Sequence, residues 1–161
     1  ERKPDHVIVA MGAEPSRPWW APGPDQPGAA NVADVREVID GTGGPLEVHV
    51  LGQGPPVVLI PSLGRGAADF ASLAARLARS GYQAICPEPR GIGGSDSRLD
   101  ELTMDDLAAD VAAVTGALGA RPATIVGHAF GNRVARMVAT RRPDLAVEAV
   151  AAEFGLETLR D

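Results

Sequence analysis

From residue 46 onward, short apolar runs alternate with segments of helical periodicity, and this alternation constrains the fold more than any other feature of the chain. The apolar runs are residues 57–60, 82–86, 123–126 and 146–151, and the helical segments are residues 67–80, 104–118 and 130–141. A further run, 46–51, alternates apolar and polar residues as a half-exposed strand does. Strands that alternate with helices of this length predict an α/β fold with a doubly wound, mostly parallel sheet.

The helix over 104–118 has recognisable start and stop signals. Thr103 precedes it as a candidate N-cap, with Asp106 three residues later, near the capping-box pattern in which Glu or Gln is preferred. Gly119 follows the last apolar residue and predicts the end of the helix.

Residues 1–44 lack the regular alternation of apolar runs and helical segments. They are expected to form an N-terminal segment and linker before a domain over 45–161. The segment contains, in order, a strand over 6–10, a Pro- and Gly-rich stretch over 14–28, a helix over 31–41 and a linker over 42–45. The helix is predicted because Val35, Val38 and Ile39 fall on one helical face and a glycine follows.

Composition and charge exclude several classes of function. Of the 161 residues, 45% are apolar and 22% are charged, which is the balance of a globular domain. A net charge of −6 gives neither nucleic acid nor an anionic membrane an attractive surface, and no apolar run approaches the ~18 residues of a membrane span. Since no signal-peptide pattern is present, we expect a cytoplasmic protein, and the missing initiator Met indicates a piece of a longer one.

The sequence gives no support for a metal site, a disulfide or a bound cofactor. The three histidines (His6, His49 and His128) are far apart, and Cys86 is the sole cysteine. Cys86 lies inside an apolar run, so we expect a small buried strand residue. We predict neither a metal nor a cofactor.

The stretch "GHAFGN", residues 127–132, joins an apolar run directly to a helical segment. Such a turn forces its central residue, Ala129, into a strained backbone conformation and requires small neighbours, which Gly127 and Gly131 provide. It also aims the backbone N–H of Phe130 and the start of the helix at one point. This arrangement predicts a binding site for an anion or a carbonyl oxygen.

Two more glycine-rich loops, "PSLGRG" (61–66) and "PEPRGIGGSD" (87–96), follow predicted strands at the edge where α/β sheets bind ligands. Together with the elbow at 127–132, and in this order, they resemble the α/β-hydrolase fold family over residues 46–152. The resemblance implies that Leu63 N–H and Phe130 N–H are oxyanion donors, and that Ser62, Gly64 and His128 lie near a substrate. It also implies that Arg90 braces its own loop and that Ser95 and Asp96 are turn and cap residues.

Two departures from the family pattern argue against serine catalysis. Ala129 occupies the nucleophile position, and a methyl group cannot form an acyl-enzyme. The family places its acid and its histidine after the elbow, whereas no histidine follows His128 here. Glu153 is the candidate for the acid, with a solvated or capping glutamate as the alternative. His128 is expected to pack at the elbow and to point away from where a base is needed.

The segment "PDHVIVAMGAEPSRP" (4–18) resembles part of the NAD(P)/flavin-binding region of old-yellow-enzyme-like oxidoreductases, with "ADVREVIDG" as a following helix. The G-x-G-x-x-G fingerprint is absent, so residues 1–44 alone are not expected to hold a dinucleotide. The alternatives are an oxidoreductase remnant joined to a hydrolase-like domain and a packed extension without a nucleotide role.

Three functions therefore stay open at this point. The first is an α/β-hydrolase-family protein that binds a small ester- or carbonyl-containing molecule at the elbow, without serine-type hydrolysis. The second is a non-catalytic binding or assembly module, and the third is a fragment of an NAD(P)/flavin-dependent oxidoreductase fused to a hydrolase-like domain. We also expect self-association through an uncovered sheet edge.

Overall fold

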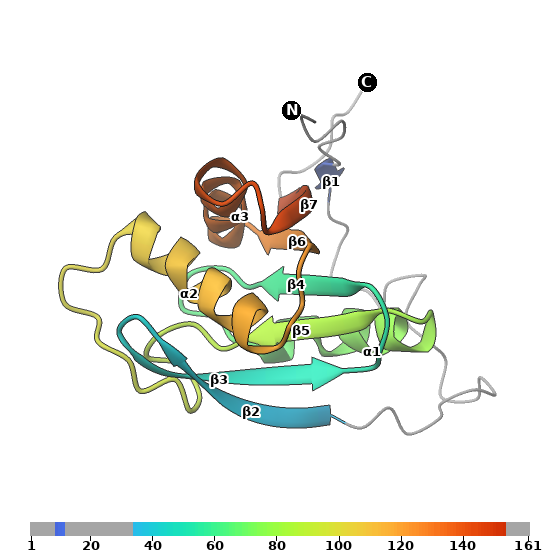
Figure 1. Cartoon of the computed structure of the whole chain (residues 1–161), viewed down its shortest axis with the longest axis horizontal. Coiled ribbons are helices and arrows are strands. Elements are labelled where there is room, and N and C mark those ends of the chain that lie inside the picture. The colour runs from blue at the N-terminus through green and yellow to red at the C-terminus, as the bar shows by residue number, and fades with distance from the viewer. Residues whose placement is uncertain (1–8, 12–33, 154–161) are drawn as a thin grey trace.

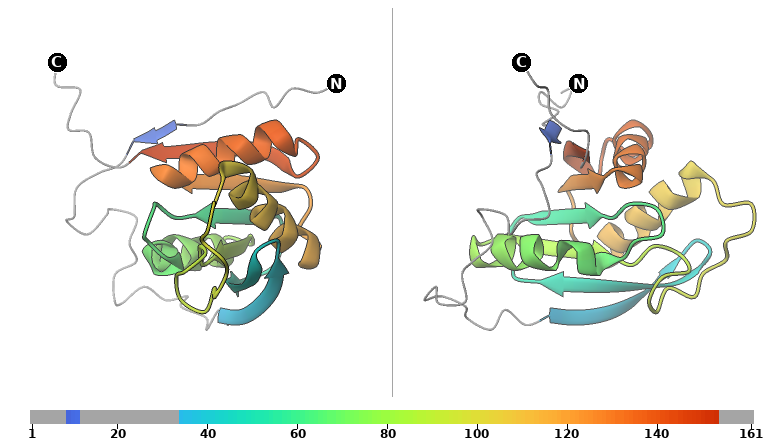
Figure 2. Two further views of the ribbon diagram at one scale, coloured as in Figure 1. Left: turned by 90° about the vertical axis from the view of Figure 1, so that its left-hand side faces the viewer. Right: turned by 180° about the vertical axis from the view of Figure 1, so that it is seen from behind.

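The computed structural model describes residues 9–11 and 34–153, which form a seven-stranded sheet with helices on both faces (Figures 1 and 2). The strands are β1 (Val9–Met11), β2 (Asp34–Gly41), β3 (Gly44–Leu51), β4 (Pro56–Ile60), β5 (Gln83–Pro87), β6 (Ala123–His128) and β7 (Ala146–Glu153). The helices are the 3-10 turn η1 (Ala67–Phe70), α1 (Ala71–Arg79), α2 (Met104–Ala117) and α3 (Phe130–Arg141).

The strands lie side by side in the order β1-β7-β6-β4-β5-β3-β2. The pairs β2–β3 and β3–β5 are antiparallel, and the other neighbouring pairs are parallel. The predicted α/β class with a mostly parallel, doubly wound sheet is therefore confirmed.

Side chains from the two faces of the sheet form two separate cores. On the face covered by α2 and α3, Val58, Ile85 and Ile125 pack with residues such as Val114 and Val138. On the opposite face, apolar side chains of β4 and β5 pack with η1 and α1; these are Val57, Leu59, Ala84, Cys86, Phe70 and Ala74. Because both faces are covered, β4 is apolar along its whole length, and β5 and β6 are apolar at most positions.

The predicted helix over 31–41 is wrong for its described part, because residues 34–41 form β2. This strand pairs with β3 along its full length, from Asp34 opposite Leu51 to Gly41 opposite Gly44. Its apolar residues satisfied a helical spacing, but only Ile39 among them is buried. The hydrogen-bonded hairpin therefore overrides the local pattern. Of the expected linker over 42–45, Thr42 and Gly43 form the tight turn, whereas Gly44 and Pro45 begin β3.

Two further expectations for residues 1–44 fall partly or wholly outside the described residues. The predicted strand over 6–10 overlaps β1, and the Pro- and Gly-rich stretch over 14–28 lies outside the described residues.

The predicted capping box at the start of α2 is confirmed. The Thr103 side chain accepts a hydrogen bond from Asp106 N, and Asp106 accepts one from Thr103 N. We predict that Thr103→Ala lowers the free energy of unfolding by about 1 kcal/mol, because it leaves an amide of the first turn without its partner. Thr103→Ser retains the hydroxyl and is the control. Urea unfolding measures both, and an equal loss in the two variants would contradict the capping role.

Cys86 is buried in β5, as expected. Burial raises the pKa of its thiol to about 12, with smaller contributions from the carboxylates of Asp34 and Glu88. Because the thiolate is the reactive form, we predict no labelling by a disulfide reagent at pH 8 in the folded protein and full labelling in denaturant. Rapid labelling of the native protein would show that β5 is more open than the structure indicates.

Candidate functional site

The turn from β6 into α3 has the strained geometry predicted from the sequence. Ala129 adopts φ 49° and ψ −109°, one of two non-glycine residues with positive φ in the described part of the chain. A Cβ on Gly127 would overlap the backbone of Gly131 and Asn132, and a Cβ on Gly131 would overlap the carbonyl oxygens of Ile60 and Pro61. The start of α3 is therefore in backbone contact with the ends of β6 and β4, which only glycine at 127 and 131 allows.

The two predicted oxyanion donors belong to loops that leave neighbouring strands. β4 and β6 are adjacent and parallel, with Ile60 opposite Gly127. The loop over 61–66 and the elbow therefore both start at the carboxyl ends of these two neighbouring strands. Phe130 is the first residue of α3, so its N–H has no acceptor inside the helix. The loop over 61–66 is tightened by a hydrogen bond from Arg65 N to Ser62 O, 3.0 Å long.

A cavity of about 650 Å³ opens beside the elbow. Four of the predicted site residues line it: Ser62, Leu63, Gly64 and Phe130. The remaining wall is predominantly apolar and includes Leu46, Ile60, Leu99, Leu102, Met104, Leu107, Val111, Val114 and Val134. Neither Ala129 nor His128 lines this cavity. Such a wall favours a neutral ligand with an apolar substituent.

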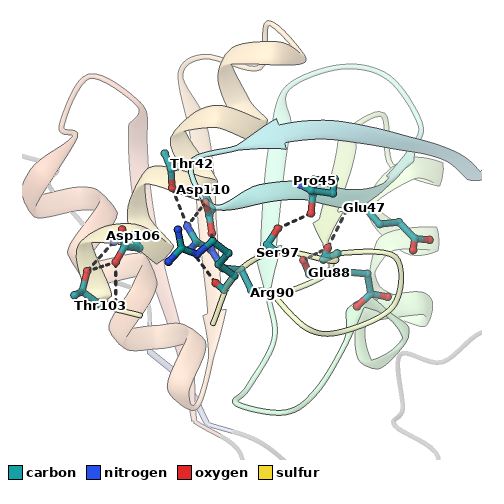
Figure 3. A network of polar contacts seen from close by, with 11 residues as sticks. Thr42, Pro45, Glu47, Glu88, Arg90, Ser97, Thr103, Asp106 and Asp110 are labelled. Carbon is teal, nitrogen blue, oxygen red and sulfur yellow. Dashed lines mark hydrogen bonds and ion pairs between the residues drawn. The ribbon is translucent and has the colours of Figure 1, made fainter. Parts of the chain in front are cut away.

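Two of the three charged residues on the cavity wall, Arg90 and Asp110, are paired with each other, and the third is Glu88. Arg90 donates to both carboxylate oxygens of Asp110, at 2.6 and 2.8 Å, and also to the hydroxyl of Thr42 and the carbonyl of Arg98 (Figure 3). The hydrogen bonds to Asp110 raise the pKa of Arg90 above its ordinary value, and burial lowers it to a smaller extent. Arg90 thus braces its own loop, as expected, and in addition ties that loop to α2 and to the β2–β3 turn.

Sequence reasoning missed a group of polar side chains behind the two site loops. His49 Nε2 lies 3.4 Å from Glu47 Oε1 and 3.6 Å from Glu88 Oε1. Glu88 accepts a hydrogen bond from Ala67 N at the end of the loop over 61–66, and Glu47 accepts one from Gly94 N. These carboxylates therefore anchor both loops to β3 and β5.

Two signals could have found this group. Glu47 and His49 occupy the polar positions of the alternating run over 46–51, and Glu88 directly follows a buried strand. Ser95, expected to be a turn residue, joins the same network: its hydroxyl donates to Glu88 O and accepts from Glu47 N. No group of three acidic, histidine or cysteine side chains in the described residues is arranged to hold a metal ion.

His128 does not line the described cavity. His128 shares its face of β6 with Val126, which packs in the core beneath α1. Burial lowers the pKa of His128, while Asp69 raises it and Arg65 lowers it to smaller extents. Glu153 ends β7 opposite Met11 of β1, and its side chain lies outside the described part of the structure.

Comparison with known proteins agrees with this architecture. The model of the family described as "alpha/beta hydrolase fold" matches residues 55–153. The chain belongs to the α/β hydrolase fold family. Within the described residues, no helix is both long and apolar enough to cross a membrane.

Two curated proteins and one solved structure are similar to parts of this chain. RutD of Enterobacter cloacae is 34% identical over 106 residues, which are 65% of this chain and 39% of RutD. A non-heme chloroperoxidase of Streptomyces lividans is 45% identical over 71 residues, which are 44% of this chain and 26% of that protein. An esterase from Exiguobacterium antarcticum superposes with a TM-score of 0.69 and 23% identity, over 73% of this chain and 46% of the esterase. The chain thus spans less than half the length of these relatives.

Proposed function

We propose that this α/β-hydrolase-family chain binds a small ester- or carbonyl-containing molecule at the elbow and does not perform serine-type hydrolysis by itself. The observation that carries the proposal is the geometry of residue 129. Ala129 retains the positive φ and the helix-start position of a nucleophile elbow, while its side chain is a methyl group. A strained backbone of this kind costs roughly 1–3 kcal/mol and persists only when its surroundings hold it in place.

The donors proposed for the carbonyl oxygen are the backbone N–H groups of Leu63 and Phe130. Both residues line the cavity, from loops that leave adjacent parallel strands. Backbone donors fixed before binding need little reorganisation to accept a partial negative charge. The apolar wall beside them suits the acyl or alkyl part of the same molecule.

The described residues of this chain do not supply two chemical groups that serine-type acyl transfer requires. Acyl transfer needs an oxygen or sulfur nucleophile, which Ala129 does not supply. It also needs a base within hydrogen-bond reach of that nucleophile. Of the histidines in the described residues, His49 is held between Glu47 and Glu88, and His128 lies on the α1 face of β6.

The test is turnover of p-nitrophenyl butyrate by the unmodified chain and by Ala129→Ser. We expect no turnover above buffer from the unmodified chain, and no multiple turnover from Ala129→Ser because the base is still lacking. We expect neither form to react with a fluorophosphonate, because that reagent labels a serine only when a base activates its hydroxyl. Multiple turnover by the unmodified chain would overturn the proposal.

Two alternatives make different predictions. A pure assembly module predicts no saturable binding of a short ester. An oxidoreductase fragment predicts tight binding of NAD(P)H or a flavin, which fluorescence titration measures.

A cytoplasmic location is also part of our proposal, since the sole cysteine is a buried free thiol. Cell fractionation of the native protein tests this location.

A further inference from the structure

The strand β2 forms one edge of the described sheet (Figure 1). Among the described residues it pairs with β3 alone, so its outer row of backbone N–H and C=O groups meets no other described strand. Edge strands of this length are commonly protected by charges, prolines or bulges. β2 carries four charged residues, but two valines, Val35 and Val38, are exposed beside them, and Val38 retains 70% of its accessible surface.

The charge pattern of β2 is suited to pairing with a second copy of itself. Successive side chains alternate between faces, so Arg36, Val38 and Asp40 share the face opposite to that of the buried Ile39. All three are exposed. The middle of this face is therefore an apolar residue flanked by a cation on one side and an anion on the other.

Two antiparallel copies of a strand are related by a two-fold axis perpendicular to the sheet, so the residue on the axis sets the whole register. With Val38 on the axis, Val38 faces Val38 and Arg36 faces Asp40 twice. With Glu37 on the axis, Glu37 faces itself and Asp34 faces Asp40. With Arg36 on the axis, two guanidinium groups oppose each other. Like charges directly opposite each other destabilise a strand pair, and opposite charges stabilise it by about 0.2–1 kcal/mol each.

We propose that two copies of this chain pair antiparallel through β2, with Val38 on the two-fold axis, and so form one continuous sheet. This inference is independent of the proposed ligand site. Arg36 lies 3.5 Å from Glu47 of its own chain, but its side chain is 71% exposed and has room for a second carboxylate. Each interface then contains two Arg36–Asp40 pairs and one Val38–Val38 contact.

Charge reversal tests the register. Arg36→Asp places two carboxylate pairs across the interface, and Asp40→Arg places two cation pairs there. We expect each single variant to raise the dimer dissociation constant by on the order of tenfold, because each replaces two attractive pairs with repulsive ones. The double variant Arg36→Asp/Asp40→Arg restores opposite charges and is expected to regain the dimer.

Analytical ultracentrifugation of the full chain measures these constants. Arg133→Asp is the matched control, because it makes the same charge change on an exposed position of α3. An unmodified chain that stays monomeric at on the order of 100 μM overturns the proposal. So does a double variant that stays as weak as the single ones.

Cross-linking gives an independent readout. Val38→Cys places two thiols across the axis, within reach of a short bismaleimide, so we expect a covalent dimer on a denaturing gel. Val35→Cys is the control: in this register the two thiols lie six residues apart along the strands, about 20 Å, beyond a short linker. Cross-linking at residue 35 that equals or exceeds that at residue 38 would contradict the register.

Discussion

Replacing Asp110 with alanine is expected to lower the free energy of unfolding by about 3–5 kcal/mol, the largest effect of any single substitution considered for this chain. The carboxylate of Asp110 is 10% exposed and its partner guanidinium, Arg90, is 6% exposed. Removing the carboxylate leaves a buried cation that has lost two hydrogen bonds. Arg90 also contacts Thr42 and Arg98, so the loop, α2 and the hairpin turn lose their common anchor.

Thermal and urea unfolding measure this loss. For a domain of this size, each kcal/mol lowers the melting temperature by about 2–4 °C. The ion pair between Arg142 and Asp144 is the matched control, because both side chains are exposed and the nitrogen–oxygen distance is 3.1 Å. Asp144→Ala is expected to lower the melting temperature far less than Asp110→Ala, because an exposed ion pair contributes little to stability. Equal losses from Asp110→Ala and Asp144→Ala would show that the buried pair does not anchor the site loops.

Gly127→Ala is expected to destabilise the fold by about 3 kcal/mol and to distort the elbow. The added Cβ would overlap the carbonyl of Gly131 and the amide of Asn132, which are backbone atoms that cannot rotate away. Relief therefore requires α3 to move from β6, and that movement displaces Phe130 N–H. We predict a lower unfolding midpoint together with weaker ester binding.

Gly116→Ala is the control for Gly127→Ala. At that position the added Cβ meets only the end of the Arg121 side chain, which is flexible. Since alanine also favours a helix interior over glycine, this change within α2 is expected to be neutral or stabilising. If Gly127→Ala were as well tolerated as Gly116→Ala, the close approach of α3 to β6 would not be required.

The parts of the structure that follow local rules could be predicted from the sequence. The elbow was found because glycine at 127 and 131 is needed wherever a strand turns directly into a helix. The capping box at Thr103 was found because both partners lie within four residues. The order of the three glycine-rich loops was visible in the chain, and the parallel sheet brings two of them together at one edge.

The features that could not be predicted depend on hydrogen-bonded pairing between strands or on contacts between residues far apart in the chain. The valines of β2 fit a helical stripe as well as a strand, and only the backbone ladder with β3 determines that residues 34–41 are extended. The contacts of His49 with Glu88 cross 39 positions and depend on the register of β3 against β5. The anchoring carboxylates were missed for the same reason.

The central claim is that the amides of Leu63 and Phe130 hold a carbonyl oxygen at an elbow that lacks a nucleophile. The most direct measurement is an NMR titration of the full chain with ethyl butyrate, in which the backbone amide resonances of these two residues are followed. We predict that both resonances shift and saturate together while the ester stays intact. Amide resonances of Leu63 and Phe130 that do not move at saturating ester, or consumption of the ester during the titration, would contradict the account.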